Sequence, residues 1–436
     1  MKVLKYPNPA EIAKALARPS DDSAAGHRSK VAGMLSVIRE EGDAAVLRFA
    51  RQFDGFAADK LEVTKAEMDA AETLISAELK TAIRQAYDNI HTFHCSQKEE
   101  IRVVQTMPGV TCWRKSVAIE KVGLYVPGGT APLFSTVLML GIPAQIAECE
   151  TVVLCTPPQP DGSVHPAVLF SALLCGIRQV FKIGGVQAIG AMTYGTKQVP
   201  QVSKIFGPGN PWVTAAKQLV SLEGVAIDLP AGPSEVGIVA DSSADPRFVA
   251  ADLLSQAEHG PDSQVLLISD SETLLGSVVP ELALQLADLP RRAFAAASLA
   301  SSTAILVHNL DEAMLIMNQY APEHLILQVS EPERRAGQVL NAGSVFLGHH
   351  TPESAGDYAS GTNHTLPTGG WARAYAGVSL DSFYKKITFQ HITPEGLRDL
   401  GPVVTVMARA EGLDAHARAV ELRTSGFSTL KSADNE

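Results

Sequence analysis

Short apolar runs alternate with helical segments through most of the chain. The first series of predicted strands lies at 122–126, 151–155, 179–183 and 202–206, with helices at 164–175, 186–194 and 211–221. The second series has strands at 236–240, 265–269, 304–307 and 325–327, with helices that begin at 246, 272 and 311. Such alternation is typical of parallel strands joined by right-handed helical crossovers. The pattern predicts an α/β protein with two units of similar design in tandem.

The two ends of the chain carry a different pattern. Before residue 111 the pattern is helical, and Thr64 and Glu67 have the spacing of a capping box at a helix start. From residue 382 onward the chain is more polar, with one predicted helix at 413–422. We therefore expect a helical N-terminal arm and a C-terminal arm of the kind that packs on another chain.

Charge and cysteine content narrow the class of protein. The 436 residues carry 36 basic and 47 acidic side chains, a net charge of −11, which argues against binding to nucleic acid or anionic lipid. The five cysteines include no C-x-x-C pair, and residues 1–20 contain no apolar signal segment. These features predict a cytoplasmic enzyme in a reducing compartment.

One uncharged stretch, 122–147, is long enough to span a bilayer. Pro127-Gly128-Gly129, Pro132 and Pro143 divide it into a short β-type run, a turn and an apolar helix. This is the pattern of a buried strand-turn-helix unit, so we expect no membrane span.

The segment from Asp245 to Gly260 predicts a helix whose end can bind a metal. An Asp cap, a proline at the first helical position and a Gly stop predict roughly 14 helical residues. Gln256 and His259 share a face of its last turn, so an amide oxygen and an imidazole nitrogen can converge on one ion. Helix capping or surface polarity is the alternative explanation of this pair.

Glu323 and His324 stand at the start of a predicted strand, at a sheet edge of the kind where α/β folds place their ligands. Adjacent strand positions point to opposite faces, but a turn begun by Pro322 can relax that rule. The alternative is a capping carboxylate beside a half-buried histidine.

The polar loop 348–364 offers further candidates. Asp357 is a better metal ligand there than His349 and His350, which we expect to face solvent. His416, near the start of the last predicted helix, indicates by itself no more than a surface histidine.

The nucleotide-binding signal is indirect. No G-x-G-x-x-G follows a strand, but glycine turns at 128–129, 184–185 and 207–209 each precede a helix. A helix N-terminus with such a turn can bind phosphate, and a tight strand-to-helix turn is the alternative. The thiol of Cys155 could form a thiohemiacetal with an aldehyde, although no nearby residue would lower its pKa, which favours a packing role.

Taken together, the motifs resemble those of the histidinol dehydrogenase family, over about residues 31–422. The motifs that carry the resemblance are Val122-Gly123-Leu124-Tyr125-Val126-Pro127-Gly128-Gly129, Gly207-Pro208-Gly209-Asn210, Ala231-Gly232-Pro233-Ser234-Glu235, Ser255-Gln256-Ala257-Glu258-His259-Gly260-Pro261-Asp262, Ala321-Pro322-Glu323-His324-Leu325, Gly356-Asp357-Tyr358 and Asn363-His364-Thr365-Leu366-Pro367-Thr368. Each motif is modest alone, and their number and order give the resemblance its weight.

The resemblance implies a homodimeric enzyme that uses zinc and NAD to oxidise L-histidinol through L-histidinal to L-histidine, in the last steps of histidine biosynthesis. The implied acid/base pair is Glu323 and His324. The implied zinc ligands are Gln256, His259, Asp357 and, from the other subunit, His416. The implied substrate contacts are Ser234, His364 and Glu411, together with His324 and the zinc ligands, and the implied NAD contacts are Tyr125, Gln187 and Asn210.

The fold that the resemblance implies has two Rossmann-like domains with parallel sheets, of the aldehyde-dehydrogenase-like kind, the second inserted in the first. With our strand series, residues 31–110 and 234–381 would form the first domain, with the zinc ligands and the acid/base pair. Residues 111–233 would form the second domain, on the NAD side. Residues 1–30 would be an N-terminal arm and 382–436 a C-terminal arm that reaches the partner subunit.

Three other interpretations compete with this one. A related enzyme could oxidise another amino alcohol or a sulfonated diol with the same zinc and NAD chemistry, although the sequence around Ser234, His364 and Glu411 keeps the biosynthetic pattern. A non-catalytic protein with a structural metal would have no use for Glu323 and His324. A thiol-dependent aldehyde dehydrogenase would keep its activity after metal chelation.

Overall fold

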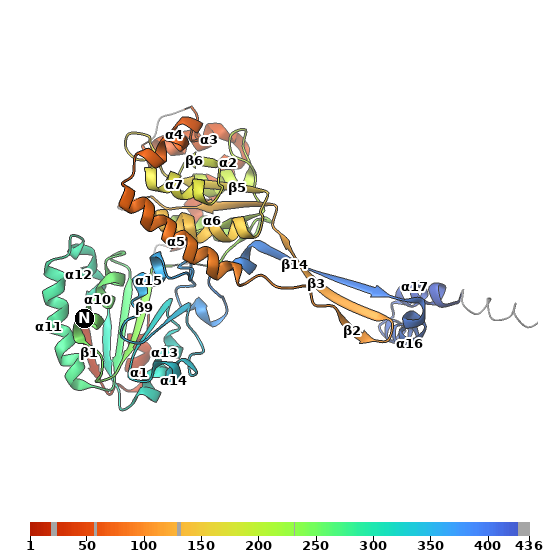
Figure 1. Ribbon diagram of the computed structural model, residues 1–436. Helices are drawn as coiled ribbons and strands as arrows, with labels where there is room; N and C mark the ends of the chain where they lie inside the picture. Colours follow the sequence, from red (N-terminus) through yellow and green to blue (C-terminus); the bar gives the residue numbers. More distant parts are fainter. Residues whose placement is uncertain (19–23, 56–58, 129–131, 231, 426–436) are drawn as a thin grey trace, which may run out of the picture. The chain divides into compact units, whose positions relative to one another are not determined.

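The computed structural model describes residues 1–18, 24–55, 59–128, 132–230 and 232–425. It divides into two compact units. The first consists of Met1–Gln97 and Ile119–Phe383, and the second of Lys98–Ala118 and the chain from Tyr384. Each unit is described separately below, with its elements labelled as in Figure 1.

The first unit contains a six-stranded sheet in which every pair of neighbours is parallel. Its strands in spatial order are β1 (Lys2–Lys5), β11 (Thr303–Leu306), β10 (Gln264–Ser269), β9 (Glu235–Ala240), β12 (His324–Gln328) and β13 (Ser344–Leu347). The central strands β9, β10, β11 and β12 are buried at nearly every position, as expected of parallel strands covered on both faces.

Helices cover both faces of this sheet. One face packs against α10 (Pro246–Ala257), α11 (Glu272–Ala287) and α12 (Arg292–Ala300). The other packs against α13 (Leu310–Tyr320) and α1 (Pro9–Ala15), which contributes Ile12 and Ala15. Two short helices, α14 (Pro332–Ala336) and α15 (Glu353–Tyr358), and the 3₁₀ turns Trp371–Arg373 and Leu380–Phe383 follow β12 and β13.

A second sheet of the same unit has five strands, again with parallel neighbours throughout. In spatial order they are β6 (Gln179–Lys182), β5 (Thr151–Thr156), β4 (Lys121–Tyr125), β7 (Lys204–Phe206) and β8 (Ala226–Ile227). The chain runs outward from β4 through β5 to β6 and then returns to β7 on the other side of β4. This reversal is the switch point at which open α/β sheets bind ligands.

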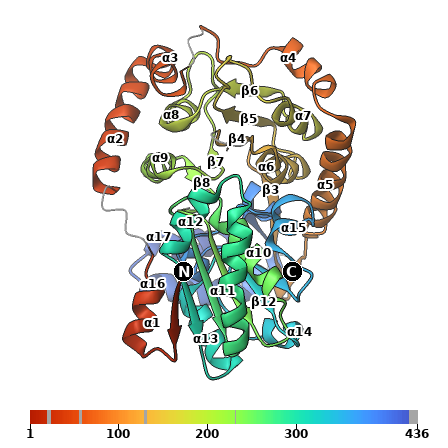
Figure 2. The same ribbon diagram turned by 90° about the vertical axis from the view of Figure 1, so that its left-hand side faces the viewer.

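Figure 2 shows helices on both sides of the five-stranded sheet. One group packs together as α2 (Ala24–Glu41), α3 (Asp43–Phe49) with the π-helical turn Ala50–Asp54, α8 (Gly185–Tyr194) and α9 (Pro211–Ser221). The other group is α4 (Lys65–Ala70) with the 3₁₀ turn Ala71–Thr73, α5 (Ala77–Cys95), α6 (Phe134–Ile146) and α7 (Pro166–Leu174). The capping box predicted at Thr64 is confirmed, because Thr64 and Glu67 exchange backbone-to-side-chain hydrogen bonds of 2.8 and 3.2 Å.

The fold class is confirmed, but the predicted grouping of residues 1–110 is wrong. Residues 2–15 form an edge strand of the six-stranded sheet and a helix that packs on this sheet, so they are not a free N-terminal arm. The helices within 31–95 pack on the five-stranded sheet rather than with 234–381. The reason is that the apolar face of α2, with Val31, Leu35 and Ile38, belongs to the same hydrophobic core as α8 and α9.

The second unit is built around an antiparallel pair of nine-residue strands, β3 (Val110–Ala118) and β14 (Tyr384–Ile392). The short strand β2 (Val104–Met107) pairs with β3, and two helices complete the unit, α16 (Pro394–Ala410) and α17 (Asp414–Thr424). The predicted C-terminal helix at 413–422 is confirmed as α17. The sequence pattern predicts residues 98–118 in the two Rossmann-like domains, but they belong to this unit, because β3 forms its ladder with β14.

Among the residues that the structure describes, no helix combines the length and the apolar character needed to cross a membrane. The uncharged stretch 122–147 covers most of β4 and all of α6, as its prolines and glycines predicted. Both elements belong to the five-stranded lobe, which is the five-stranded sheet with its covering helices.

Candidate active site

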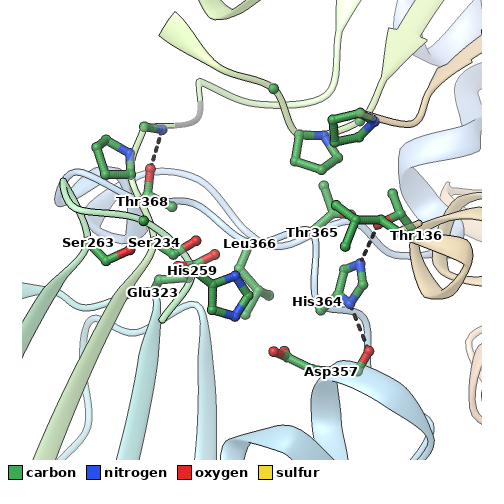
Figure 3. Close-up of a pocket in the computed structure, with 18 of the residues that line it drawn as sticks. Thr136, Ser234, His259, Ser263, Glu323, Asp357, His364, Thr365, Leu366 and Thr368 are labelled. Carbon is green, nitrogen blue, oxygen red and sulfur yellow. Dashed lines mark hydrogen bonds between the residues drawn. The ribbon is translucent and has the colours of Figure 1, made fainter. Parts of the chain in front are cut away.

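The first unit encloses a pocket of about 320 Å³ between its two sheets (Figure 3). Pro127 and the turn 207–210 line it from the five-stranded side, where β4 and β7 end. Ser234 and Glu323 line it from the six-stranded side, where β9 and β12 begin. The pocket therefore lies at the switch point of one sheet and faces the amino ends of two central strands of the other.

Glu323 and His324 lie together in the wall of this pocket. Ala321 has a left-handed backbone conformation with φ of 54°, and Glu323 comes before the first strand residue, so strand alternation does not separate the two side chains. The imidazole Nδ1 lies 3.6 Å from Glu323 Oε2, and both side chains are buried. The turn at Pro322 thus relaxes the rule as the sequence suggested.

Burial and the nearby carboxylates shift the pKa values of Glu323 and His324. Burial raises the pKa of Glu323 to about 8. Burial also opposes charge on His324, but the carboxylates of Glu323, Asp357 and Glu353 outweigh it and raise the pKa of His324 to about 10. His324 Nε2 lies 3.3 Å from Asp357 Oδ1, yet it has no hydrogen-bond partner of acceptable geometry among the described residues.

Three groups of the kind that can bind a metal ion converge beside this nitrogen. One potential ligand atom from each of His259, Glu353 and Asp357 lies within 4.8 Å of the other two. Gln256 is buried next to them: with its amide nitrogen facing Glu353, it donates to both carboxylate oxygens at 3.0 and 3.2 Å. The same orientation also places the amide nitrogen 3.2 Å from His324 Nδ1.

Of the four predicted zinc ligands, Gln256, His259 and Asp357 are therefore brought together in the first unit. Nitrogen and oxygen donors of this kind suit zinc or a similar borderline cation. The buried His324 Nε2 beside them has no hydrogen-bond partner among the described residues. His259 lies just beyond the end of α10, which ends two residues earlier than the sequence predicted. His416 lies in the first turn of α17 in the second unit, so its part in the site stays a prediction.

His364 and Ser234, two of the implied substrate contacts, also line the pocket. His364 Nδ1 donates to the carbonyl oxygen of Asp357 at 2.8 Å, and the hydroxyl of Thr136 lies 3.2 Å from its Nε2 (Figure 3). A carbonyl can only accept, so the proton sits on Nδ1 and Nε2 accepts from Thr136. Glu411, the third implied substrate contact, follows α16 in the second unit.

Two of the three implied NAD contacts meet at the start of α8. The hydroxyl of Tyr125 accepts from the backbone nitrogen of Gly185 at 3.1 Å, and burial raises the pKa of Tyr125. The amide of Gln187 donates to Asp54 at 2.9 Å. Asn210 lies apart from them in the pocket wall, where its side-chain oxygen caps α9 and its amide nitrogen is left for other partners.

A buried ion pair fixes the glycine turn beside Asn210. Lys217 Nζ donates to the carbonyl of Gly207 at 2.7 Å and to Asp228 at 2.5 Å, and Asp228 accepts from the backbone nitrogen of Gly207 at 2.7 Å. Gly207 has φ of +126°, and a Cβ there would lie 2.0 Å from the carbonyl oxygen of Tyr125. The turn therefore requires glycine.

Sequence reasoning missed Glu353 and Asp54. Glu353 stands four residues before Asp357, the spacing of one helix face, so the pattern contained a signal for it. Asp54 ends a π-helical turn and binds Gly184 and Gln187 from 130 or more residues away, which no local pattern reveals. The thiol alternative is not supported: Cys155 is fully buried, and burial raises its pKa, which disfavours the thiolate.

A buried carboxylate and imidazole beside a converging donor cluster, in a pocket that faces the switch point of a parallel sheet, define an enzyme site suited to proton transfer and oxidation. The sequence model of the family described as "Histidinol dehydrogenase" matches residues 16–424. Histidinol dehydrogenase from Bacteroides thetaiotaomicron is 58% identical over 431 residues, 99% of this chain and 100% of that one. Histidinol dehydrogenase from Xanthomonas axonopodis pv. citri is 54% identical over 97% of this chain and 99% of its own.

One solved structure agrees with the sequence relatives. The crystal structure of histidinol dehydrogenase from Elizabethkingia anophelis matches with a TM-score of 0.95 and 48% identity, covering 98% of this chain and 99% of that one. The chain is thus an oxidoreductase of the alcohol and aldehyde class. It belongs to the histidinol dehydrogenase family.

Proposed function

We propose that the enzyme oxidises L-histidinol to L-histidine by way of L-histidinal, with two molecules of NAD as hydride acceptors and a bound zinc ion. The observation that carries the proposal is the buried Glu323 and His324 pair beside the cluster of His259, Glu353 and Asp357. The activity named for relatives that match nearly full length supports the substrate.

In the first oxidation the alcohol loses a hydride to NAD and a proton to the protein. In our proposal the neutral form of His324 takes the hydroxyl proton at Nε2, because this ring nitrogen lies in the pocket wall and has no hydrogen-bond partner among the described residues. The products are the aldehyde, NADH and one proton.

In the second oxidation a water adds to the aldehyde, and the hydrate gives its hydride to a second NAD. Glu323 is suited to remove the water proton, because its carboxylate is fixed by the backbone nitrogen of Glu235 at 2.9 Å. The products are the carboxylate, NADH and two protons. Both steps use the same pocket, so the aldehyde need not leave.

Gln256, His259 and Asp357 would hold the zinc ion together with His416 of the partner subunit. When bound, the ion supplies positive charge that offsets the nearby carboxylates and holds the amino and imidazole nitrogens of the substrate. Ser234 and His364 would bind the substrate from the pocket wall, and Glu411 of the partner subunit would complete its binding site.

Tyr125, Gln187 and Asn210 would contact NAD at the carboxyl edge of the five-stranded sheet, where α/β folds bind dinucleotides. A homodimer with shared sites is part of the same proposal, since His416 and Glu411 lie in a separate unit. All five cysteines are free thiols, which supports a reducing compartment such as the cytoplasm.

The test is the amount of NADH formed per L-histidinol consumed with excess NAD, before and after chelation and zinc restoration. We expect about two NADH per substrate, from two hydride transfers, and loss of activity without metal. Absence of NADH from histidinol with folded, metal-loaded protein would overturn the proposal and direct the search to other amino alcohols and sulfonated diols. Full activity after verified metal removal would overturn the zinc dependence alone.

A further inference from the structure

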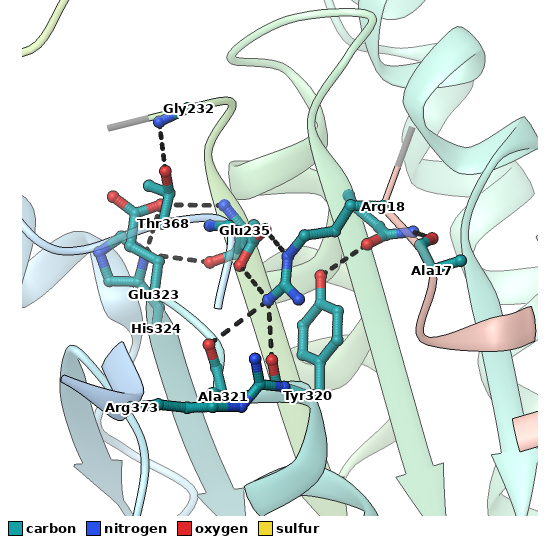
Figure 4. A network of polar contacts seen from close by, with 12 residues as sticks. Ala17, Arg18, Gly232, Glu235, Tyr320, Ala321, Glu323, His324, Thr368 and Arg373 are labelled. Atoms are coloured by element: carbon teal, nitrogen blue, oxygen red, sulfur yellow. Dashed lines mark hydrogen bonds and ion pairs between the residues drawn. The ribbon is translucent and has the colours of Figure 1, made fainter. Parts of the chain in front are cut away.

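We propose that Arg18 and Glu235 are a positioning pair for the catalytic groups. Arg18 fixes the side chain of Glu235, and the backbone of Glu235 holds Glu323 and His324 in place (Figure 4). The identity of the reaction rests on the proposed function, whereas the positioning role rests on the contacts described below.

Arg18 presents its guanidinium to several acceptors at once. Nε and Nη2 donate to the two carboxylate oxygens of Glu235, the second at 2.9 Å. Nη2 also donates to the carbonyl of Tyr320 at 2.8 Å, and the guanidinium carbon lies 4.3 Å from the centroid of the Tyr320 ring. A planar fork is needed for this combination, and a lysine ammonium cannot reproduce it.

The backbone next to Arg18 is also anchored to the sheet. The hydroxyl of Tyr320 donates to Gln264 at 2.8 Å, and the amide of Gln264 donates to the carbonyl of Ala17 at 3.1 Å. The backbone at Ala17 is therefore fixed to the sheet, and the guanidinium of Arg18 is fixed by its acceptors at the other end of the side chain.

Glu235 connects this anchor to both catalytic groups. Its carboxylate, with only 3% of the side chain exposed, accepts from Arg18 and from the backbone nitrogen of Gly369 at 3.1 Å. Its own backbone nitrogen donates to Glu323 Oε2 at 2.9 Å, and its carbonyl oxygen lies 3.3 Å from His324 Nδ1. The main chain of one residue thus contacts both members of the pair.

Stability alone does not account for a buried ion pair at this place. Desolvation of two charges cancels much of their attraction, and apolar replacements are often as stable. Without Arg18, however, the carboxylate of Glu235 would be buried with a single neutral donor, and it would move toward water. The backbone nitrogen that holds Glu323 would move with it, as would the neighbouring Ser234.

The experiment compares Arg18→Gln with the wild type in steady-state oxidation of L-histidinal. We expect kcat to fall roughly 10- to 100-fold with KM values for L-histidinal and NAD changed less than about threefold, because misplaced catalytic groups slow the reaction more than they weaken binding. Arg84→Gln is the matched control: Arg84 also pairs with a glutamate, Glu72, and lies over an aromatic ring, Phe170, but in the five-stranded lobe. It should leave kcat unchanged.

A double-mutant cycle separates positioning from a general loss of structure. In L-histidinal oxidation, the step assigned to Glu323, Arg18 should act through that residue. Arg18→Gln added to Glu323→Gln should then lower kcat for L-histidinal by less than about twofold further. The same full factor in both backgrounds, or an unchanged kcat in Arg18→Gln, would overturn the proposal.

Chemical rescue covers the case in which Arg18→Gln folds poorly. Arg18 has 21% of its side chain exposed, so a small cation can enter the space left by Arg18→Ala. Millimolar guanidinium should restore kcat in Arg18→Ala, and methylammonium, which lacks the fork, should not. Equal rescue by both ions, or by neither, would contradict the assigned role.

Hydrogen exchange on the same variants requires no substrate. Arg18→Gln should speed exchange of the backbone amide of Glu235, in peptides covering 232–237, while Arg84→Gln should not. Inactive wild-type enzyme would overturn the proposed function, and the exchange data would then decide the positioning role by themselves. Unchanged exchange at Glu235 would refute it.

Discussion

The buried carboxylate of Asp252 provides a test of how burial shifts a pKa and changes the stability of the folded protein. It lies in α10, one helical turn before Gln256, with 8% of the residue exposed. Gln328 donates to its carboxylate at 2.6 Å, yet burial raises the pKa of Asp252 from 3.8 to about 6. We expect Asp252→Asn to stabilise the protein at neutral pH, because the amide removes a buried charge and its oxygen can still accept from Gln328.

The sign and size follow from the pKa shift. The folded state binds a proton more tightly than the unfolded state between pH 3.8 and 6, so the stability of the wild type falls as the pH rises through this window. A shift of about two units corresponds to about 2–3 kcal/mol. That cost is present in full above pH 6 and absent below pH 4.

The assay is the thermal midpoint of both proteins from pH 4 to pH 8. We expect equal midpoints at the acid end and a gain of roughly 2–3 °C for Asp252→Asn at pH 8. The exposed Asp88→Asn on α5 serves as the control and should leave the midpoint unchanged at every pH. A gain that does not depend on pH, or a loss at pH 8, would refute the reasoning.

Four further outcomes are expected. Glu323→Gln should retain hydride transfer from L-histidinol but slow L-histidinal oxidation by roughly 10²- to 10⁴-fold in stopped-flow NADH traces, and a second step at full rate would exclude its role as base. Lys217→Met should lower the free energy of unfolding in urea by about 3–5 kcal/mol, because Asp228 is left buried without its cation, and an unchanged midpoint would contradict this. Gly207→Ala should raise the Kd of NAD in fluorescence titration at least tenfold, since its Cβ would meet the Tyr125 carbonyl oxygen, whereas Gly276→Ala, with open space around it, should not. His259→Asn and His416→Asn should each be inactive. If each site takes residues from both subunits, dimers re-formed from equal amounts of the two variants should regain about a quarter of wild-type activity, because half of the dimers are mixed and each of these has one intact site.

The sequence predicted the central strands because their signal is local. Strands such as β5 and β10 are short apolar runs between turn residues, and α10 carries its own cap, since Asp245 accepts from the backbone nitrogen of Arg247. The edge strand β1 has only four residues and one partner, so its pattern is weak. The pair of β3 and β14 was missed because most positions of β14 are exposed and partner strands lie more than 260 residues apart.

The candidate site shows the same division between local and distant signals. Gln256 with His259, and Glu323 with His324, could be identified from short motifs that the structure brings together in one pocket. Glu235 stands in one of the motifs, but no local pattern indicates its contact with Arg18, because the two residues lie 217 positions apart in the chain. Capping residues predict where a helix starts and ends, but they do not show which of two similar sheets it will cover. For this reason the sequence pattern predicts the wrong sheet for residues 31–95.

The pairing of β1 with β11 has a consequence for synthesis on the ribosome. Lys2 pairs with Thr303, so β1 waits for a partner made some 300 residues later, about 15–60 s at ordinary translation rates. The five-stranded lobe, formed by consecutive residues before 230 apart from the segment 98–118, can fold during that interval. The contacts of Glu235 with Arg18 and with Glu323 can form together only after residue 323 has been made, so the candidate site is incomplete in shorter nascent chains.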